Sequence, residues 1–239
     1  MTKDSAGSAS GGAGMLVLGV DTCGPSGSVA LARIGASDVE LLGQIELAGR
    51  SYSATLLAAV GELLGRAGAR PGQLAAIAVT SGPGSFTGVR VGLSAVKGLA
   101  EPGGIPVVAV SRLAVLARKA GVEEAALDAH RNEIFVRLAG EGANAREILA
   151  SQADLGTLGI LPEHIAVCED TAEMLVRATW VQAEVLRVAA PMAAEAIELA
   201  APRIRAREFA DLALLDGHYL RRSDAEIFGD FAQAARPAC

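Results

Sequence analysis

The first half of the chain alternates short apolar runs with apolar residues at helical spacing. The apolar runs, each of which predicts a strand, cover residues 15–20, 28–32, 39–47, 74–80 and 105–110. Helical spacing occurs over residues 56–64 and 89–100, and a helix capped by Ser111 is expected to run to about Lys119. The resulting order βββαβαβα is typical of an α/β sheet.

The second half shows shorter and weaker patterns of the same kind. Strands are predicted at residues 125–128, 133–138, 145–149, 164–168 and 184–188, and helices at residues 171–179 and 192–200. We therefore expect an N-terminal lobe at residues 15–110 and a smaller C-terminal lobe at residues 111–222. Residues 1–14 are small, polar and glycine-rich, which predicts a disordered extension, and residues 223–239 are expected to form a flexible tail.

A glycine-rich segment, SGPGSFTGVR at residues 81–90, joins a predicted strand to a predicted helix. Such a turn presents free N–H groups and the positive end of the helix dipole, which together favour phosphates or carboxylates. Alternatively, Ser85 or Thr87 caps the helix and the glycines only permit a tight turn. The segment is not a P-loop, because no Gly-Lys-Ser/Thr follows, and its glycines do not match G-x-G-x-x-G.

Composition narrows the classes of function. The net charge is −6, from 21 basic and 27 acidic residues, and no basic run stands out. This argues against a nucleic-acid-binding face of the chain's own, although a partner can supply the positive surface. The three cysteines are widely spaced and form no CxxC pair, which fits the reducing cytoplasm. The three scattered histidines provide no metal-binding pattern, and no apolar run reaches the ~18 residues that a membrane span requires.

Three segments together resemble the TsaB (YeaZ) family: LGVDT at residues 18–22, GPGSFTGVRVG at 82–92 and LDAHRNEIF at 127–135. The resemblance implies an α/β fold of the actin/Hsp70/sugar-kinase (ribonuclease H-like) type, with two lobes, mixed sheets and a truncated second lobe. Two positions depart from the family pattern. Tyr52 precedes Ser53 where the family usually has a His-Ser pair, and His130 stands where it often has Arg, beside Arg131.

The resemblance also implies a role. The family is the bacterial partner subunit in the formation of N6-threonylcarbamoyladenosine on tRNA. This implies a non-catalytic protein that docks to a TsaD-type catalytic subunit, works with a TsaE-type ATPase and reaches tRNA only through that complex. A homodimer is an alternative arrangement. No catalytic residue, no metal and no required cofactor is expected in the chain itself.

A nucleotide is a further expectation, as ATP or ADP with Mg²⁺ at a subunit interface. The candidate contacts for a nucleotide or another anion are Asp21, Thr22, Gly84, Ser85, Thr87 and Gly88. Asp21 matches the residue that orients Mg²⁺ in catalytic members of the fold. Alternatively, Asp21 caps the turn that follows the first strand. The second lobe shows no glycine-rich D-x-G-G turn to close over a nucleotide from the other side.

The second predicted helix carries a row of small residues, Gly88, Gly92 and Ala95, which Leu99 extends. A small-residue row lets another helix approach closely, either the first helix of the same chain or a helix pair of another subunit. The resemblance favours another subunit. The residues predicted to make that contact are Leu56, Val60, Gly92, Ala95 and Leu99.

Two other classes of function compete with a partner subunit. One is an autonomous ATP-binding, kinase-like or peptidase-like enzyme of the same fold that uses Asp21, Ser85 and Thr87. The sequence places no histidine to activate Ser85, and capping explains a serine at a helix start. The other is a homodimeric binding module outside tRNA modification.

Overall fold

The computed structural model describes residues 14–49, 51–140 and 145–221. Its first sheet has the order β3-β2-β1-β4-β5, in which β1, β2 and β3 are antiparallel and β1, β4 and β5 are parallel. The strands are β1 (Met15–Asp21), β2 (Gly27–Ile34), β3 (Val39–Leu47), β4 (Ala76–Thr80) and β5 (Val107–Val110). The predicted mixed sheet is therefore confirmed.

Helices cover both faces of this first sheet. Helices α1 (Tyr52–Arg66) and α2 (Phe86–Gly103) pack on one face, and α6 (Ala193–Arg205) packs on the other. The alternation of β1 explains this, because Leu18 points into the α1–α2 core and Val17 into the α6 core. A short 3-10 helix, η1 (Pro71–Gln73), precedes β4.

The second sheet repeats the same connectivity in the order β10-β9-β6-β7-β8. Its strands are β6 (Ala125–Asp128), β7 (Glu133–Leu138), β8 (Arg146–Ser151), β9 (His164–Val167) and β10 (Glu184–Arg187). Its outer helices are short: α4 (Gln152–Thr157) has 6 residues and α5 (Asp170–Thr179) has 10, against 15 in α1 and 18 in α2. The shorter second lobe is thus a smaller version of the first.

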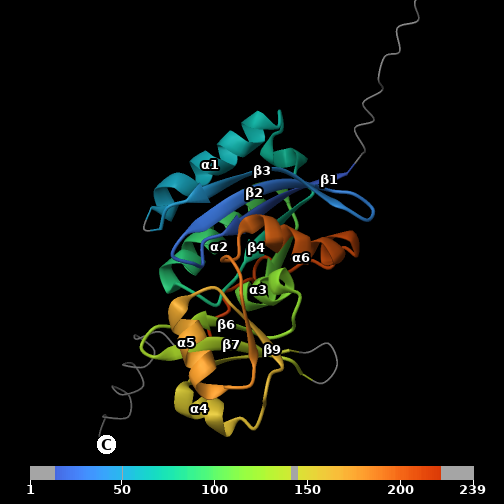
Figure 1. Cartoon of the computed structure of the whole chain (residues 1–239). Helices are drawn as coiled ribbons and strands as arrows, with labels where there is room; N and C mark the ends of the chain where they lie inside the picture. The colour runs from blue at the N-terminus through green and yellow to red at the C-terminus, as the bar shows by residue number, and fades with distance from the viewer. Residues whose placement is uncertain (1–13, 50, 141–144, 222–239) are drawn as a thin grey trace, which may run out of the picture.

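The two helices between the sheets are exchanged. Helix α3 (Arg112–Ala120) follows the last strand of the first sheet but packs against the second, whereas α6 follows the second sheet and packs against the first. Figure 1 shows α3 and α6 side by side between the two sheets, and the two helices contact each other. Sequence order therefore does not decide which sheet a helix covers.

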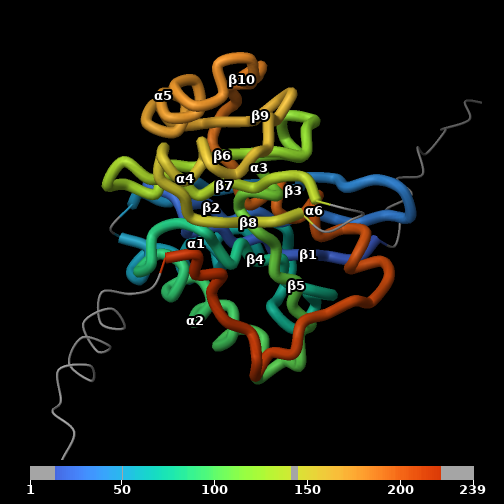
Figure 2. The backbone as a smooth tube through the Cα atoms, turned by 90° about the horizontal axis from the view of Figure 1, so that it is seen from below, coloured from blue at the N-terminus to red at the C-terminus, as the bar shows by residue number. Residues whose placement is uncertain are grey.

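The chain after α6 forms a strap, residues 206–221, that touches both sheets. Its Ala210 N–H donates to Val107 of β5 at 2.8 Å, and its His218 N–H donates to Ser81 at 2.7 Å. At its end, Arg221 pairs with Glu133 of β7 at 2.5 Å. Figure 2 follows the strap, in red, from α6 to the glycine segment. The predictions for residues 1–13 and 223–239 lie outside the described residues.

Candidate functional site

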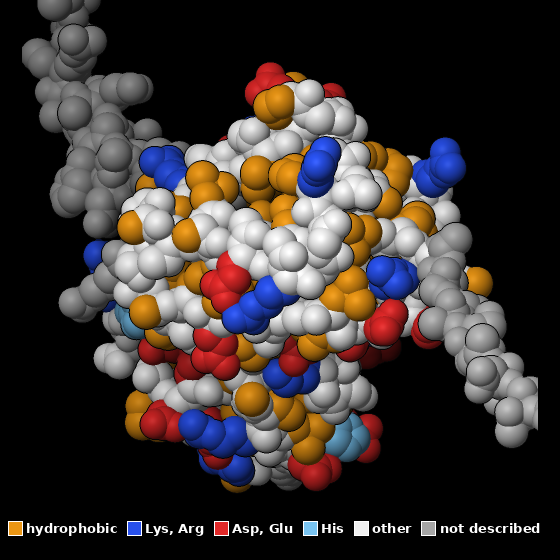
Figure 3. All heavy atoms as spheres, turned by 90° about the horizontal axis from the view of Figure 1, so that it is seen from above, with side chains coloured by type: hydrophobic (Ala, Val, Ile, Leu, Met, Phe, Trp, Pro, Cys, Tyr) orange, Lys and Arg blue, Asp and Glu red, His pale blue; other side chains and the backbone are white. Residues whose placement is uncertain are grey.

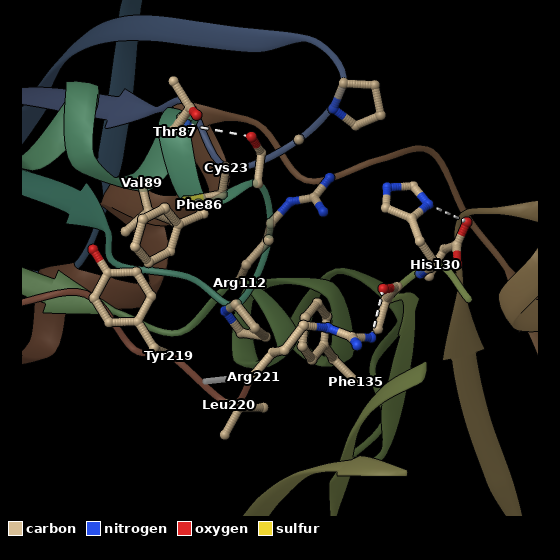
Figure 4. Close-up of a pocket in the computed structure, with 18 of the residues that line it drawn as sticks. Cys23, Phe86, Thr87, Val89, Arg112, His130, Phe135, Tyr219, Leu220 and Arg221 are labelled. Carbon is tan, nitrogen blue, oxygen red and sulfur yellow. Dashed lines mark hydrogen bonds and ion pairs between the residues drawn. The ribbon is translucent and has the colours of Figure 1, made fainter. Parts of the chain in front are cut away.

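A cavity of about 1190 Å³ lies between the two lobes. The first lobe lines it with the turn after β1, the start of α1 and residues 83–89, and the second lobe with residues 128–131 and Glu169. Residues 218–221 of the strap line another part of it. Figure 4 shows these side chains converging from three parts of the chain. Because both lobes contribute, the cavity exists only in the assembled fold.

The glycine segment is held against the turn after β1. Ser85 caps α2, since its Oγ accepts a hydrogen bond from the N–H of Gly88 at 3.3 Å. The N–H of Ser85 donates to the carbonyl of Cys23 at 2.8 Å. A Cβ at Gly84 would collide with that carbonyl, so this close approach requires glycine. The predicted cap is confirmed for Ser85, whereas Thr87 lies exposed in the first turn of α2.

Asp21 and Thr22 lie behind the cavity rather than in its lining. Asp21 Oδ1 accepts the N–H of Cys23 at 2.9 Å, which agrees with the turn-capping interpretation. Burial raises the pKa of Asp21, although the charge of Arg112 acts in the opposite direction. Thr22 Oγ1 donates to the carbonyl of Gly88 at 2.7 Å. Of the six predicted nucleotide or anion contacts, those that line the cavity are Gly84, Ser85, Thr87 and Gly88.

The small-residue row of α2 has an explanation within the chain. A Cβ at Gly88 or at Gly92 would collide with Thr22, so these glycines let α2 pack against the end of β1. This corrects the expectation that another helix packs against these glycines. The space beside them is occupied by Thr22, at the end of β1. Among the predicted contact residues, Leu56 and Val60 are 1% and 3% exposed in the core beneath α1.

The predicted interface therefore needs a different set of residues. Gly92 is also buried, which leaves only Ala95 and Leu99 of the five predicted residues partly exposed. The exposed sides of α1 and α2 instead form what we call the α1–α2 face, made of Leu57, Ala58, Gly61, Ser94, Ala95 and Gly98. Helix α1 packs beside α2, so these positions lie on neighbouring helices. The signal was available in the sequence, because each helix repeats small or apolar residues one position away from the buried row.

The second-lobe wall of the cavity carries backbone strain. His130, Arg131 and Asn132, in the turn between β6 and β7, have φ values of 61°, 57° and 60°. Three consecutive non-glycine residues in the left-handed region are costly, and such strain is concentrated at functional sites. Asp128 Oδ1 supports the turn by accepting the N–H of His130 at 2.7 Å. The sequence predicted a turn here, but not its conformation.

Arg112 is a cavity residue that sequence reasoning missed. The residue is 3% exposed, and its Nη1 lies 3.7 Å from Glu169 Oε1. Burial lowers the pKa of Arg112, but the carboxylates of Asp21 and Glu169 outweigh burial and raise it. An arginine directly after a helix cap is usually exposed, so no local signal marked this one.

The strap forms one side of the cavity through aromatic and polar contacts. Tyr219 packs on Phe86 with ring centroids 5.0 Å apart, and the Arg90 guanidinium lies 3.9 Å from the Phe86 ring centroid. Next to them, His218 Nε2 contacts Glu147 Oε2 at 2.8 Å. Arg90 thus makes contacts within the chain, with the rings of Phe86 and Tyr219.

The nucleophilic groups near the cavity are not activated. Burial raises the pKa of Cys23 well above its usual range and that of Cys168 to about 11, so both thiols stay protonated at neutral pH. Burial likewise raises the pKa of Tyr52 to about 12, and its hydroxyl donates to the carbonyl of Gly24 at 2.8 Å. Within the described ranges, no three His, Cys, Asp or Glu side chains gather in a way that can hold a metal ion.

Sequence comparison connects this geometry to known proteins. A family model described as TsaD, tRNA N6-adenosine threonylcarbamoyltransferase, matches residues 44–157. The chain is 36% identical over 127 residues to the tRNA threonylcarbamoyladenosine biosynthesis protein TsaB of Haemophilus influenzae, which covers 51% of this chain and 52% of that protein. The chain thus spans about half the length of the curated relatives that it matches.

Structural comparison covers more of the chain. A Pseudomonas aeruginosa structure, described as an uncharacterized protein with similarity to peptidase YEAZ, aligns with a TM-score of 0.72 at 25% identity. That alignment covers 87% of this chain and the whole of the other. A YeaZ structure from the same organism aligns with a TM-score of 0.68 at 25% identity, covering 86% of this chain and the whole of the other.

The chain is thus similar to TsaB proteins in sequence over about half of its length, and to YeaZ structures in fold over 86–87% of it. The actin/sugar-kinase-like fold with two lobes, which the resemblance of three short segments implied, is confirmed. In the part of the chain that the structure describes, no helix has both the length and the hydropathy to cross a bilayer.

Proposed function

We propose that this chain is a non-catalytic subunit in the cytoplasmic formation of N6-threonylcarbamoyladenosine on tRNA, docking to a TsaD-type catalytic subunit. In the proposed complex, a TsaE-type ATPase supplies nucleotide hydrolysis, and tRNA is reached through the partners. The similarity to TsaB proteins and the match to the TsaD model both support a role in this modification.

The observation that carries the docking proposal is the α1–α2 face. Leu57, on this face, is one of the exposed large hydrophobic side chains of the described residues, at 56%. A Cβ at Gly61 or at Gly98 would meet nothing within 4 Å, so the backbone of both helices is open to close approach. Figure 3, viewed from the side of α1, shows hydrophobic side chains among uncharged surface, with isolated charges between them. Small and apolar positions on two neighbouring helices suit packing against a helix pair of another subunit.

The cavity residues favour a partner role over autonomous catalysis. The Oγ of Ser85 accepts the capping hydrogen bond of α2, and the imidazole of His218 is paired with Glu147. Neither arrangement is the hydroxyl–imidazole pair of a hydrolase. The proposed role requires no cofactor bound to this chain itself.

The docking proposal can be tested with one substitution and a matched control. Leu57→Glu places a charge on the α1–α2 face, whereas Met174→Glu places the same charge on α5, where Met174 is 58% exposed. We expect Leu57→Glu to prevent co-elution with the cognate TsaD-type subunit in size-exclusion chromatography, and Met174→Glu to co-elute like the wild type, because a buried unpaired charge opposes association.

Both variants should remain folded, with the wild-type circular dichroism spectrum, since both positions are exposed. Co-elution of Leu57→Glu would overturn the docking face. The role in the modification is tested separately, by measuring threonylcarbamoyladenosine formation on tRNA in a mixture reconstituted with the TsaD-type and TsaE-type partners. Full activity of that mixture without this chain would overturn the proposed role.

A further inference from the structure

The sequence that follows the strap carries an amphipathic pattern. Residues 222–239 lie outside the described part of the chain, and their sequence is RSDAEIFGDFAQAARPAC. Ser223 and Glu226 have the S-x-x-E spacing of a capping box, which marks a helix start, and Pro237 marks an end. Between them an apolar stripe recurs at i, i+3, i+4 and i+7: Phe228, Phe231, Ala232 and Ala235. The pattern predicts a helix over residues 224–235 that is apolar on one side.

This predicted helix requires a surface on which to pack. A helix of this length is marginal in water by itself and gains most of its stability from burying its apolar side. Gly229, in its interior, lowers its helix propensity further. Phe228 and Phe231 are two of the five phenylalanines of the chain, so burying them contributes much of what the segment can gain. Without a surface, the sequence predicts only a flexible tail.

The described chain ends beside the start of α2. Tyr219 packs on Phe86, the first residue of α2, and the Arg90 guanidinium, one turn further on, lies 6.0 Å from the Tyr219 ring centroid. Arg221 donates a hydrogen bond to the carbonyl of Ala129 at 2.9 Å, which fixes the end of the strap. Figure 2 shows this red end beside α1 and α2. A segment that continues from Arg221 therefore starts at the end of α2 from which the α1–α2 face extends.

The lengths match. Residues 222 and 223 can span about 10 Å between Arg221 and the predicted helix. That helix, at about 1.5 Å per residue, is about 18 Å long, and so is α2 from Phe86 to Gly98. A helix that starts beside the first turn of α2 and runs in the same direction can therefore cover the α1–α2 face.

The charges match in the same orientation. Helix α2 exposes Arg90 near its start and Glu101 near its end. The segment carries Asp224 and Glu226 at its start and Arg236 directly after its end. When the two helices lie side by side and run in the same direction, carboxylates face the arginine at one end and an arginine faces the glutamate at the other. Such complementarity favours this orientation over the reverse.

The face also suits large side chains. A Cβ at Gly61 or at Gly98 would meet nothing within 4 Å, so there is open space above both glycines. Leu57, one turn before Gly61 on α1, is exposed. The rings of Phe228 and Phe231 can enter the space above the glycines and cover this leucine, since small residues on one helix let large residues of another approach closely.

We propose that residues 224–235 form a helix that packs on the α1–α2 face of the same chain and thereby opposes the docking of a partner there. A short linker gives the segment an effective concentration of roughly millimolar at the face, so even a modest contact keeps the face covered. The packing of the segment is independent of any partner, whereas its effect on docking rests on the proposed function.

The packing is tested by thiol labelling of the isolated, full-length chain. Ser94→Cys puts a thiol on the α1–α2 face, and Ala178→Cys puts one on the exposed side of α5 as the matched control. The rate of maleimide modification is measured at each site by peptide mass spectrometry. We expect Phe228→Ser with Phe231→Ser to speed modification at Ser94→Cys by about tenfold or more, and to leave the rate at Ala178→Cys unchanged.

The labelling also identifies what covers the face. A contact within one chain protects the thiol to the same extent at every protein concentration. Protection that grows with concentration would mean that a second copy covers the face, and would overturn the proposal. An equal rate at Ser94→Cys with and without the two phenylalanine substitutions would overturn it as well.

The effect on docking is measured separately. The chain with both phenylalanine substitutions should bind the TsaD-type subunit about tenfold more tightly than the wild type, because the face no longer has to be uncovered first. Unchanged affinity would overturn the opposing role of the segment. Failure of both proteins to bind would instead contradict the proposed docking, and the labelling result would still decide whether the segment packs on the face.

Discussion

The two lobes follow the same path with different chemistry at matching places. Each begins with three antiparallel strands, continues with two helix–strand units and ends in a helix that packs on the other sheet. In each, the first strand ends in an aspartate whose Oδ1 accepts the N–H two residues further on. The distances are 2.9 Å for Asp21 with Cys23 and 2.7 Å for Asp128 with His130. The two lobes therefore share not only their order of elements but also this hydrogen bond at the end of the first strand.

The lobes differ in what they present to the cavity from these equivalent turns. After β4 the first lobe has the glycine segment, whose α2 end offers N–H donors. After β9 the second lobe has Glu169, whose Oε2 accepts the Asp128 N–H at 2.5 Å and whose Oε1 faces Arg112. The first lobe thus contributes hydrogen-bond donors to the cavity, and the second contributes a carboxylate. Two lobes with the same backbone path can therefore form a site that is chemically asymmetric.

The largest effect that tests this comparison is expected at the third residue of α2. That residue is Gly88 in the first lobe, and the third residue of α5 in the second lobe is Ala172, which is fully buried. Gly88→Ala should destabilise the protein by about 3 kcal/mol, because its Cβ meets the Thr22 carbonyl. Ala172→Gly should cost only about 1 kcal/mol. Urea unfolding of both variants measures this, and equal losses would show that α2 does not depend on glycine there.

A smaller effect is expected at Glu147, through which the second lobe holds the strap. Although burial opposes ionisation, hydrogen bonds from His218, Ser111 and Arg137 lower the pKa of Glu147. Glu147→Gln should therefore cost about 2 kcal/mol at neutral pH. Because the folded pKa is lowered, this stability is present above the usual value of 4.5 and is lost as the pH falls through the folded pKa. Urea midpoints of both proteins measured from pH 7 to pH 3 should converge, and a constant difference would contradict this account.

The smallest effect separates the two equivalent aspartates. Burial raises the pKa of Asp21, so its contribution is favourable below the usual value of 3.8 and is lost as the pH rises through the folded pKa. The stability of Asp21→Asn relative to the wild type should thus increase with pH, by on the order of 1 kcal/mol. Asp128→Asn, on the less buried turn, serves as the matched control. Thermal melts of the wild type and of both variants between pH 4 and pH 8 measure these stabilities. If the two variants showed the same pH dependence relative to the wild type, the two aspartates would not differ as proposed.

Local patterns predicted the elements of the fold well. Apart from α4 and η1, which were not predicted, the strands and helices occur close to the predicted residues, because buried strands and amphipathic helices leave strong periodic signals. Ser85 and Ser111 cap α2 and α3 as expected, and Gly121 ends α3 with a φ of 73°. These features depend on neighbours in the sequence.

Contacts between distant residues could not be predicted in the same way. From the sequence, Gly92 is interpreted as a residue for helix–helix packing. In the structure the space beside it is filled by Thr22, seventy positions earlier in the chain. From the sequence alone, Arg112 is expected to be an exposed charge. In the structure it is buried by the second sheet and by the turn after β1. The candidate site is therefore the least predictable part, since both lobes and the strap build it.

The exchange of α3 and α6 has a consequence for the newly made chain. The face of the first sheet that includes Val17, Ala30 and Ala78 is covered by α6, which ends at Arg205. During synthesis from the N-terminus, this apolar face stays uncovered until α6, which begins at Ala193, has left the ribosome. The first lobe therefore cannot complete its core on its own. A nascent chain that stops before α6 exposes an apolar sheet face, which chaperones can bind.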